Sequence, residues 1–146
     1  MCPSDLDLQA FLPFRLNRLA AEMSRRLLEI YGDQYGIDIP EWRIMATLGK
    51  SGTATAQEVV RSTRTHKSTI SRAVSKLIAM GWLERVQADG DRRNLPLRLT
   101  ETGARCYGEI VPKVLAAERE VLGDPQLNAD QVLDSIAKLE RALGID

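Results

Sequence analysis

The sequence predicts a mainly helical α+β fold with one small β-hairpin. Apolar residues recur at helical spacing near both ends of the chain, two short helical patterns in the middle are separated by a polar turn, and a short alternating pattern follows Gly81. With 146 residues and 44% hydrophobic content, the chain is long enough for one domain with its own core. We expect one domain over residues 1–146, with a lobe at 38–100 between helical regions at 8–36 and 101–146.

The first helical region carries apolar residues three and four positions apart, which places them on one stripe. They are Leu12, Leu16, Leu19, Met23, Leu27 and Ile30. This pattern predicts a helix from about Pro13 to Tyr35 that ends at Gly36. A second helix is expected to begin near Pro40, where a proline costs no hydrogen bond, and to run to about Lys50.

Thr55 and Glu58 have the spacing of a capping box, so they predict a short third helix that ends near Arg61. A polar stretch, 62–66, then precedes a fourth helix that ends at Gly81. The fourth helix has one apolar face and one face of hydrogen-bonding or cationic side chains. The apolar face consists of Ile70, Ala73, Val74, Leu77 and Ile78, and the polar face of Ser68, Thr69, Arg72, Ser75 and Lys76.

Two strands are expected after Gly81, at 82–87 and 95–99, with a charged loop between them. Pro96 cannot donate to a strand ladder, so we expect the second strand at an edge. Thr100 should cap a fifth helix that runs to about Leu122 and bends at Pro112. A last helix follows a break at 123–125, and its heptad-like apolar spacing suits packing against another chain.

The charges are unevenly distributed along the chain. The formal net charge is zero, but residues 61–98 contain nine of the 20 basic residues and three acidic ones. This segment therefore carries +6 and the rest of the chain −6. Such a basic segment is typical of a phosphate-binding surface, although a solvated basic face would look the same.

Two short helices followed by a basic hairpin are in the order of a winged helix-turn-helix. The polar face of the fourth helix could enter the major groove of DNA, where Arg72 has the shape to pair with guanine. The hairpin could reach the minor groove, which attracts arginine where it is narrow. The sequence therefore predicts a protein that binds double-stranded DNA.

The chain also resembles the multiple antibiotic resistance regulator (MarR) family over nearly its whole length. Four segments carry the resemblance, in the family's order: 39–43, 67–74, 91–93 and 99–103. It implies a homodimeric repressor, built as a single winged-helix domain with dimerisation helices at both ends, that a ligand releases from a pseudo-palindromic operator. Arg93 would enter the minor groove, with Asp91 holding it. Ile39, His66 and Pro96 depart from the common pattern of the family.

The residues expected to contact DNA lie on the fourth helix and in the hairpin loop. They are His66, Lys67, Ser68, Thr69, Ser71, Arg72, Ser75, Lys76, Asp91, Arg92 and Arg93. Lys67 and Lys76 would contact phosphate, which positions a protein without conveying sequence information. The alternatives are a solvated helix face and an exposed ion pair in the loop.

The resemblance also implies an effector site where the first, second and fifth helices meet. Residues on these segments that could line it are Arg15, Arg18, Met23, Tyr31, Trp42, Arg43 and Met45. Segments 13–17 and 41–43 look similar to the branch of the family that responds to aromatic carboxylates or their coenzyme A thioesters. An anion of that kind would need an arginine. The apolar members of this set could instead belong to the core.

The sequence argues against an enzyme. One histidine and two distant cysteines cannot form a metal cluster or a Cys-His nucleophile pair, so no cofactor, metal or catalytic residue is expected. No stretch suits a membrane span and the first residues do not resemble a secretory signal, so we expect a cytoplasmic protein. Two alternatives stay open, a thiol redox sensor that uses Cys2 or Cys106 and a winged helix used only for protein contacts.

Overall fold

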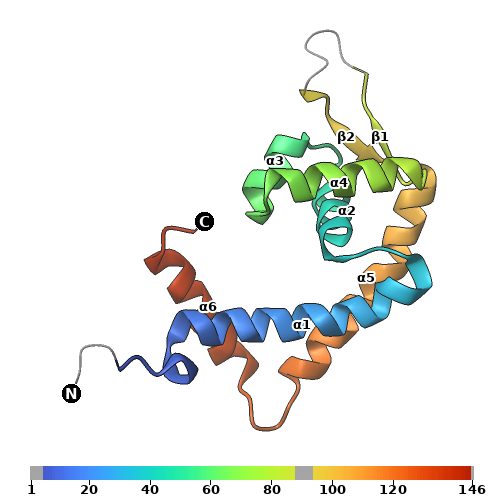
Figure 1. Cartoon of the computed structure of the whole chain (residues 1–146). Helices are drawn as coiled ribbons and strands as arrows, with labels where there is room; N and C mark the ends of the chain where they lie inside the picture. Colours follow the sequence, from blue (N-terminus) through green and yellow to red (C-terminus); the bar gives the residue numbers. More distant parts are fainter. Residues whose placement is uncertain (1–4, 88–93, 146) are drawn as a thin grey trace. The chain divides into compact units, whose positions relative to one another are not determined.

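A computed structural model describes residues 5–87 and 94–145 of the chain (Figure 1). These residues form six α-helices, one short 3-10 helix and one two-stranded sheet. In chain order they are η1 (Leu8–Ala10), α1 (Leu12–Tyr35), α2 (Ile39–Ser51), α3 (Ala56–Thr63), α4 (Lys67–Ala79), β1 (Leu83–Arg85), β2 (Leu97–Leu99), α5 (Glu101–Leu122) and α6 (Ala129–Ala142). The predicted mainly helical fold with a small hairpin is confirmed.

The chain divides into two compact units, Met1–Val111 and Pro112–Asp146. The boundary falls inside α5, at the proline that the sequence places in the middle of this helix. Proline has no backbone N–H, so α5 lacks one internal hydrogen bond there. The first unit contains α1 to α4, the sheet and the beginning of α5, and the second contains the end of α5 and all of α6.

Local capping signals fix the helix ends of the first unit. Gly36 ends α1 in the left-handed conformation, with φ of 71°. Asp38 and Glu41 form a capping box at the start of α2, and Thr55 and Glu58 form one at the start of α3. The expected boundaries are confirmed to within about two residues, whereas η1 was not predicted.

The sheet is shorter than predicted, with three residues in each strand. β1 and β2 pair antiparallel, with Leu83 opposite Leu99 and Glu84 opposite Arg98. β2 is an edge strand of this two-stranded sheet, as expected from Pro96, and one isolated β-bridge joins its Leu97 to Ala54. Pro96 lies just before β2, where its carbonyl accepts the N–H of Val86 at 2.7 Å.

The core of the first unit lies between α2, α4 and the sheet, and Figure 1 shows α4 crossing α2 beside the hairpin. The fully buried side chains here share an aliphatic character. They include Ile44, Met45, Leu48, Val59, Ile70, Leu77, Leu83 and Leu97. Burying such side chains contributes about 1.5–3 kcal/mol each, so α4 is held by its apolar face.

The second unit buries little of its apolar surface. None of the residues of α6 is buried, although Asn128 caps this helix by accepting the N–H of Gln131. Large apolar side chains are exposed in both units. In the first unit they are Leu6, Leu8, Phe11, Leu12, Leu19 and Met23, and in the second Leu115, Leu127, Leu133, Ile136 and Leu143.

Among the described residues, no helix combines the length and the apolar character that crossing a bilayer requires.

The start of α5 fits tightly against the turn between α4 and β1. The Thr100 hydroxyl donates to the carbonyl of Gly81 at 2.6 Å and accepts the N–H of Gly103 at 3.1 Å. A Cβ on Gly103 would lie 2.1 Å from the carbonyl oxygen of Trp82. Only glycine therefore allows α5 to approach this turn so closely.

Replacing Gly103 with alanine should therefore destabilise the fold. The contact is with backbone, which cannot yield as a flexible side chain would, and we expect a loss of about 1–3 kcal/mol in the free energy of unfolding. Gly108→Ala in the same helix is the matched control, because a Cβ there meets nothing within 4 Å. It should stabilise the chain by about 0.5–1 kcal/mol. Urea unfolding of both variants measures the difference, and equal effects would contradict this account.

Candidate nucleic-acid interface

The two faces of α4 are separated as the sequence predicts. Ile70, Ala73, Val74 and Leu77 are buried. The opposite face carries exposed side chains, with Thr69 half-buried beside them: Lys67, Ser68, Ser71, Arg72, Ser75 and Lys76. The packing of α4 therefore presents hydroxyls and cations to solvent along one side.

His66 is the N-cap of α4. Its Nδ1 accepts the N–H of Ser68 at 3.1 Å and lies 2.7 Å from the Ser68 hydroxyl. The turn before it contains Arg64 in the left-handed conformation, with φ of 50°. The cap satisfies a backbone donor at the end of the helix that would approach DNA first.

The described part of the hairpin adds further charged side chains beside α4. Arg98 and Glu84, which are paired across the strands, form an exposed ion pair at 2.7 Å. Arg85 is exposed. The expected wing residues Asp91, Arg92 and Arg93 lie outside the described residues.

Lys76 differs from the other cations of α4 because it has a buried partner. Its Nζ lies 2.6 Å from Oε1 of Glu41, whose side chain is only 6% exposed. The structure thus connects the last turn of α4 to the first turn of α2.

The residues expected to bind an effector do not form one site. Tyr31 stacks on Trp42 with ring centroids 5.5 Å apart, and Trp42 stacks on Tyr107 at 5.8 Å. This aromatic stack joins α1, α2 and α5. Tyr31 is only 1% exposed, and its burial raises the pKa of its phenol to about 12.

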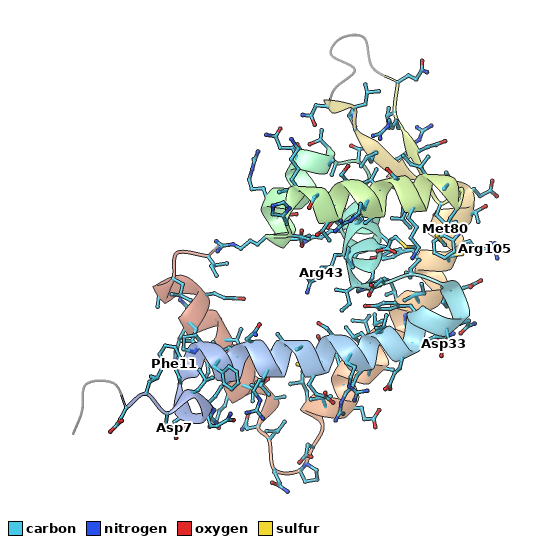
Figure 2. The ribbon with its side chains drawn as sticks, viewed as in Figure 1. Asp7, Phe11, Asp33, Arg43, Met80 and Arg105 are labelled. Atoms are coloured by element: carbon cyan, nitrogen blue, oxygen red, sulfur yellow. The ribbon has the colours of Figure 1, made fainter. Side chains whose placement is uncertain are left out.

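Arg43 and Met45 follow Trp42 on α2 but face different surroundings. Met45 is fully buried and belongs to the core. Arg43 is exposed, and Figure 2 shows it projecting from the side of α2. Its positive charge acts to lower the pKa of Tyr31, against the larger effect of burial.

Arg15 and Arg18 instead line a concavity of about 810 Å³ at the beginning of α1. Its other lining residues are Gln9, Leu19, Ala21, Glu22 and Arg25. Arg18 donates to the side chain of Gln9, and its guanidinium lies 5.6 Å from the centroid of the Phe14 ring. Met23, with 43% of its surface exposed, does not line this concavity.

Cys106 is a buried thiol, 6% exposed, and burial raises its pKa. A raised pKa leaves less thiolate, the form that reacts with oxidants. Cys2 lies outside the described residues. Within those residues, no group of three or more metal-ligating side chains occurs.

Sequence reasoning missed two residues of these sites. Tyr107 completes the aromatic stack, but nothing in its helical pattern distinguishes it from an ordinary core residue. Glu41 had a detectable signal, because an acid three residues after Asp38 has capping-box spacing. The sequence could not show that the same carboxylate would also reach Lys76.

Comparison with known proteins identifies relatives of one kind. A family model described as the MarR family matches residues 35–94. The regulator FarR of Neisseria gonorrhoeae is 30% identical over 115 residues, which cover 76% of this chain and 79% of FarR. The regulator PecS of Dickeya dadantii is 29% identical over 122 residues, which cover 81% of this chain and 73% of PecS. Both relatives are described as HTH-type transcriptional regulators.

Solved structures of the same fold include two complexes. NadR in complex with 4-hydroxyphenylacetate has a TM-score of 0.69 and 25% identity, with 89% of this chain and 92% of NadR covered. A MarR variant from E. coli complexed with operator DNA has a TM-score of 0.77 and 23% identity, with coverage of 96% and 99%. At this identity the second match shows the fold alone.

Proposed function

Since this chain belongs to the MarR family of DNA-binding transcription regulators, we propose that it is a homodimeric repressor that a small-molecule effector releases from its operator. The polar face of α4 is the observation that carries this proposal. Its side chains are exposed because the opposite face is held in the core, and the helix begins at His66, whose side chain satisfies a backbone donor of the first turn. The E. coli protein complexed with operator DNA has the same fold, so this fold is one that can bind an operator.

Individual residues of α4 should differ in what they read. Arg72 has the donor geometry for a guanine edge, whereas Lys67, at the start of the helix, is suited to a phosphate. Ser68, Thr69, Ser71 and Ser75 would make the remaining hydrogen bonds of this face. From the hairpin, Arg92 and Arg93 would follow the adjacent minor groove, with Asp91 orienting Arg93.

An operator is first selected with the parent chain from a pool of duplexes. Replacing Arg72 with alanine should then cost about 1–3 kcal/mol of binding free energy on this operator, and it should relax the preference at one base pair. Replacing Lys67 with alanine should weaken binding to all duplexes alike. It should also reduce the slope of log affinity against log salt concentration by about one. Fluorescence anisotropy on operator and scrambled duplexes, at several salt concentrations, measures both effects. Equal losses on the two duplexes for Arg72→Ala would refute its assignment as a base-reading residue.

The exposed apolar side chains of α1 and α6 support a homodimer. Leu12, Leu19 and Met23 lie along α1, and Leu133 and Ile136 along α6, all more than 40% exposed. Monomers seldom leave so many large apolar groups in water, and a second copy of the chain would cover them.

Sedimentation equilibrium at micromolar concentration should therefore find a dimer. Leu133→Lys together with Ile136→Lys should shift it toward monomer, because both substitutions put charge on the apolar face of α6. The matched control is a pair of lysines at the exposed polar positions Ser135 and Gln131, which should leave the dimer intact. A monomeric parent chain would refute the dimer.

The dimer should select half-sites about 10 base pairs apart.

The effector we propose is an aromatic carboxylate or its coenzyme A thioester, the class to which the ligand of the NadR complex belongs. Two arginine-bearing places could hold its carboxylate. One is the concavity at the beginning of α1, with Arg15 and Arg18, and the other is Arg43 beside the aromatic stack. Arg43 is the better placed, because it is exposed and adjoins Trp42, the half-buried ring at the centre of the aromatic stack.

Arg43→Ala should then abolish release of DNA by 4-hydroxyphenylacetate while it leaves operator affinity nearly unchanged. A tenfold weakening of DNA binding by the ligand corresponds to about 1.4 kcal/mol of coupling, and DNA must weaken ligand binding by the same factor. Arg15→Ala tests the second place, and Arg26→Ala, an exposed arginine of α1 that does not line the concavity, is the control. A normal response from both Arg43→Ala and Arg15→Ala would exclude both places.

The thiol-sensor alternative has less support. Cys106 is buried and its pKa is raised, which is the opposite of an activated thiol.

A further inference from the structure

Glu41 is the one charged side chain that is buried in the part of the chain the structure describes. It lies in the first turn of α2, where its Oε1 accepts the backbone N–H of Asp38 at 3.4 Å. The same oxygen lies 2.6 Å from the ammonium of Lys76. One carboxylate oxygen therefore closes the capping box of α2 and holds the last turn of α4.

The two partners of this ion pair are unequal. The side chain of Lys76 is 46% exposed, whereas that of Glu41 is 6% exposed. A buried carboxylate needs a cation and hydrogen bonds to offset its lost hydration, but an exposed ammonium could pair equally well with water or phosphate. Glu41 thus needs Lys76 to stay ionised in its buried position, whereas Lys76 could be charged in water without Glu41.

The pair lies at the end of α4 opposite to the end expected to enter DNA, so a small tilt there would displace the DNA-facing residues. His66, Ser68 and Arg72 lie toward the beginning of the helix, which is the end that enters a DNA groove in helix-turn-helix proteins. Lys76 lies nine residues after Lys67, or about 14 Å along the axis at 1.5 Å per residue. A tilt of about 10° at the held end would move the first turn by about 2 Å. Residues of a binding site must be held to within about 0.5 Å, so this displacement would disturb their contacts with DNA.

We propose that Glu41 is a positioning residue for DNA recognition, and that it acts by holding Lys76. The pair fixes the angle of α4 on α2, and it keeps the Lys76 ammonium on a carboxylate instead of on the DNA backbone. This inference rests on the proposed DNA-binding function. It assigns Lys76 a role different from the phosphate contact expected from the sequence, because a lysine that neutralises Glu41 releases no counterion from DNA.

Salt dependence separates the two roles of Lys76. Each phosphate contact contributes about 0.9 to the slope of log affinity against log salt concentration. Lys76→Met should leave this slope unchanged, and it should lower affinity for the selected operator about tenfold with little effect on a scrambled duplex. Glu41→Gln keeps an acceptor for the Asp38 N–H but frees Lys76, so it should steepen the slope by about 0.9 and tighten binding to the scrambled duplex.

Combined and control variants complete the experiment. The double variant Glu41→Gln with Lys76→Met should have the same slope as the parent chain. Lys76→Arg should discriminate between the two duplexes as the parent chain does, in contrast to Lys76→Met. Lys67→Met, on the same helix and also exposed, should lower the slope by about 0.9 whether or not Glu41 is replaced. Circular dichroism checks that each variant folds. If Glu41→Gln does not fold, the comparison of Lys76→Met with Lys76→Arg, in salt slope and in discrimination between the duplexes, tests the proposal.

The inference would be overturned if Lys76→Met lowered the slope by about 0.9, weakened both duplexes equally and had the same effect in the Glu41→Gln background as in the parent chain. Lys76 would then be a phosphate contact and its pairing incidental. Failure of the proposed function looks different, because then the parent chain and Lys67→Met would both show no preference for any selected duplex.

Discussion

The packing of α4 on α2 is the contact on which the candidate interface depends. Ile70 and Leu77 are buried on α4, and Ile44 and Leu48 on α2. Because these side chains fix one face of α4 in the core, the other face must be exposed, and its residues can be hydroxyls and cations at no cost in buried polarity. The sheet completes this core through Leu83 and Leu97, which ties the base of the hairpin to the same two helices.

An aliphatic contact between helices holds them together but does not define their angle closely. Several crossing angles bury nearly the same area, since the preferred angles scatter widely. A directional contact between the two helices adds the missing constraint, because Glu41 of α2 holds the last turn of α4 through Lys76. A recognition helix needs this constraint because hydrogen bonds to base edges are sensitive to small displacements.

The same helix α2 also faces the region proposed for the effector. Trp42 follows Glu41 directly and stacks on Tyr31 and Tyr107. A ligand that shifted this stack would act on a residue adjacent to the carboxylate that holds α4. The approach of α5 to α2 is close here, since a Cβ on Gly49 would lie 2.3 Å from the ring of Tyr107. Close packing of this kind transmits displacement instead of absorbing it.

Much of the fold could be predicted from the sequence because its signals are local. The apolar period of α1, the left-handed Gly36 and the capping box of Thr55 and Glu58 each act within a few residues, and each predicted the correct element. The two faces of α4 were predictable for the same reason.

The tertiary structure decided what depends on partners distant in sequence. An isolated bridge joined Leu97 to Ala54, and contact across 35 residues joined Lys76 to Glu41. Burial likewise separated Met45 and Tyr31, which are in the core, from Arg15 and Arg18, which line a concavity elsewhere on α1. The sequence by itself determined which side chains each helix carries and on which face, because helical periodicity is local. Only the packing of the helices decided which charges meet and which stay in water, because that depends on the three-dimensional arrangement of residues far apart in the chain.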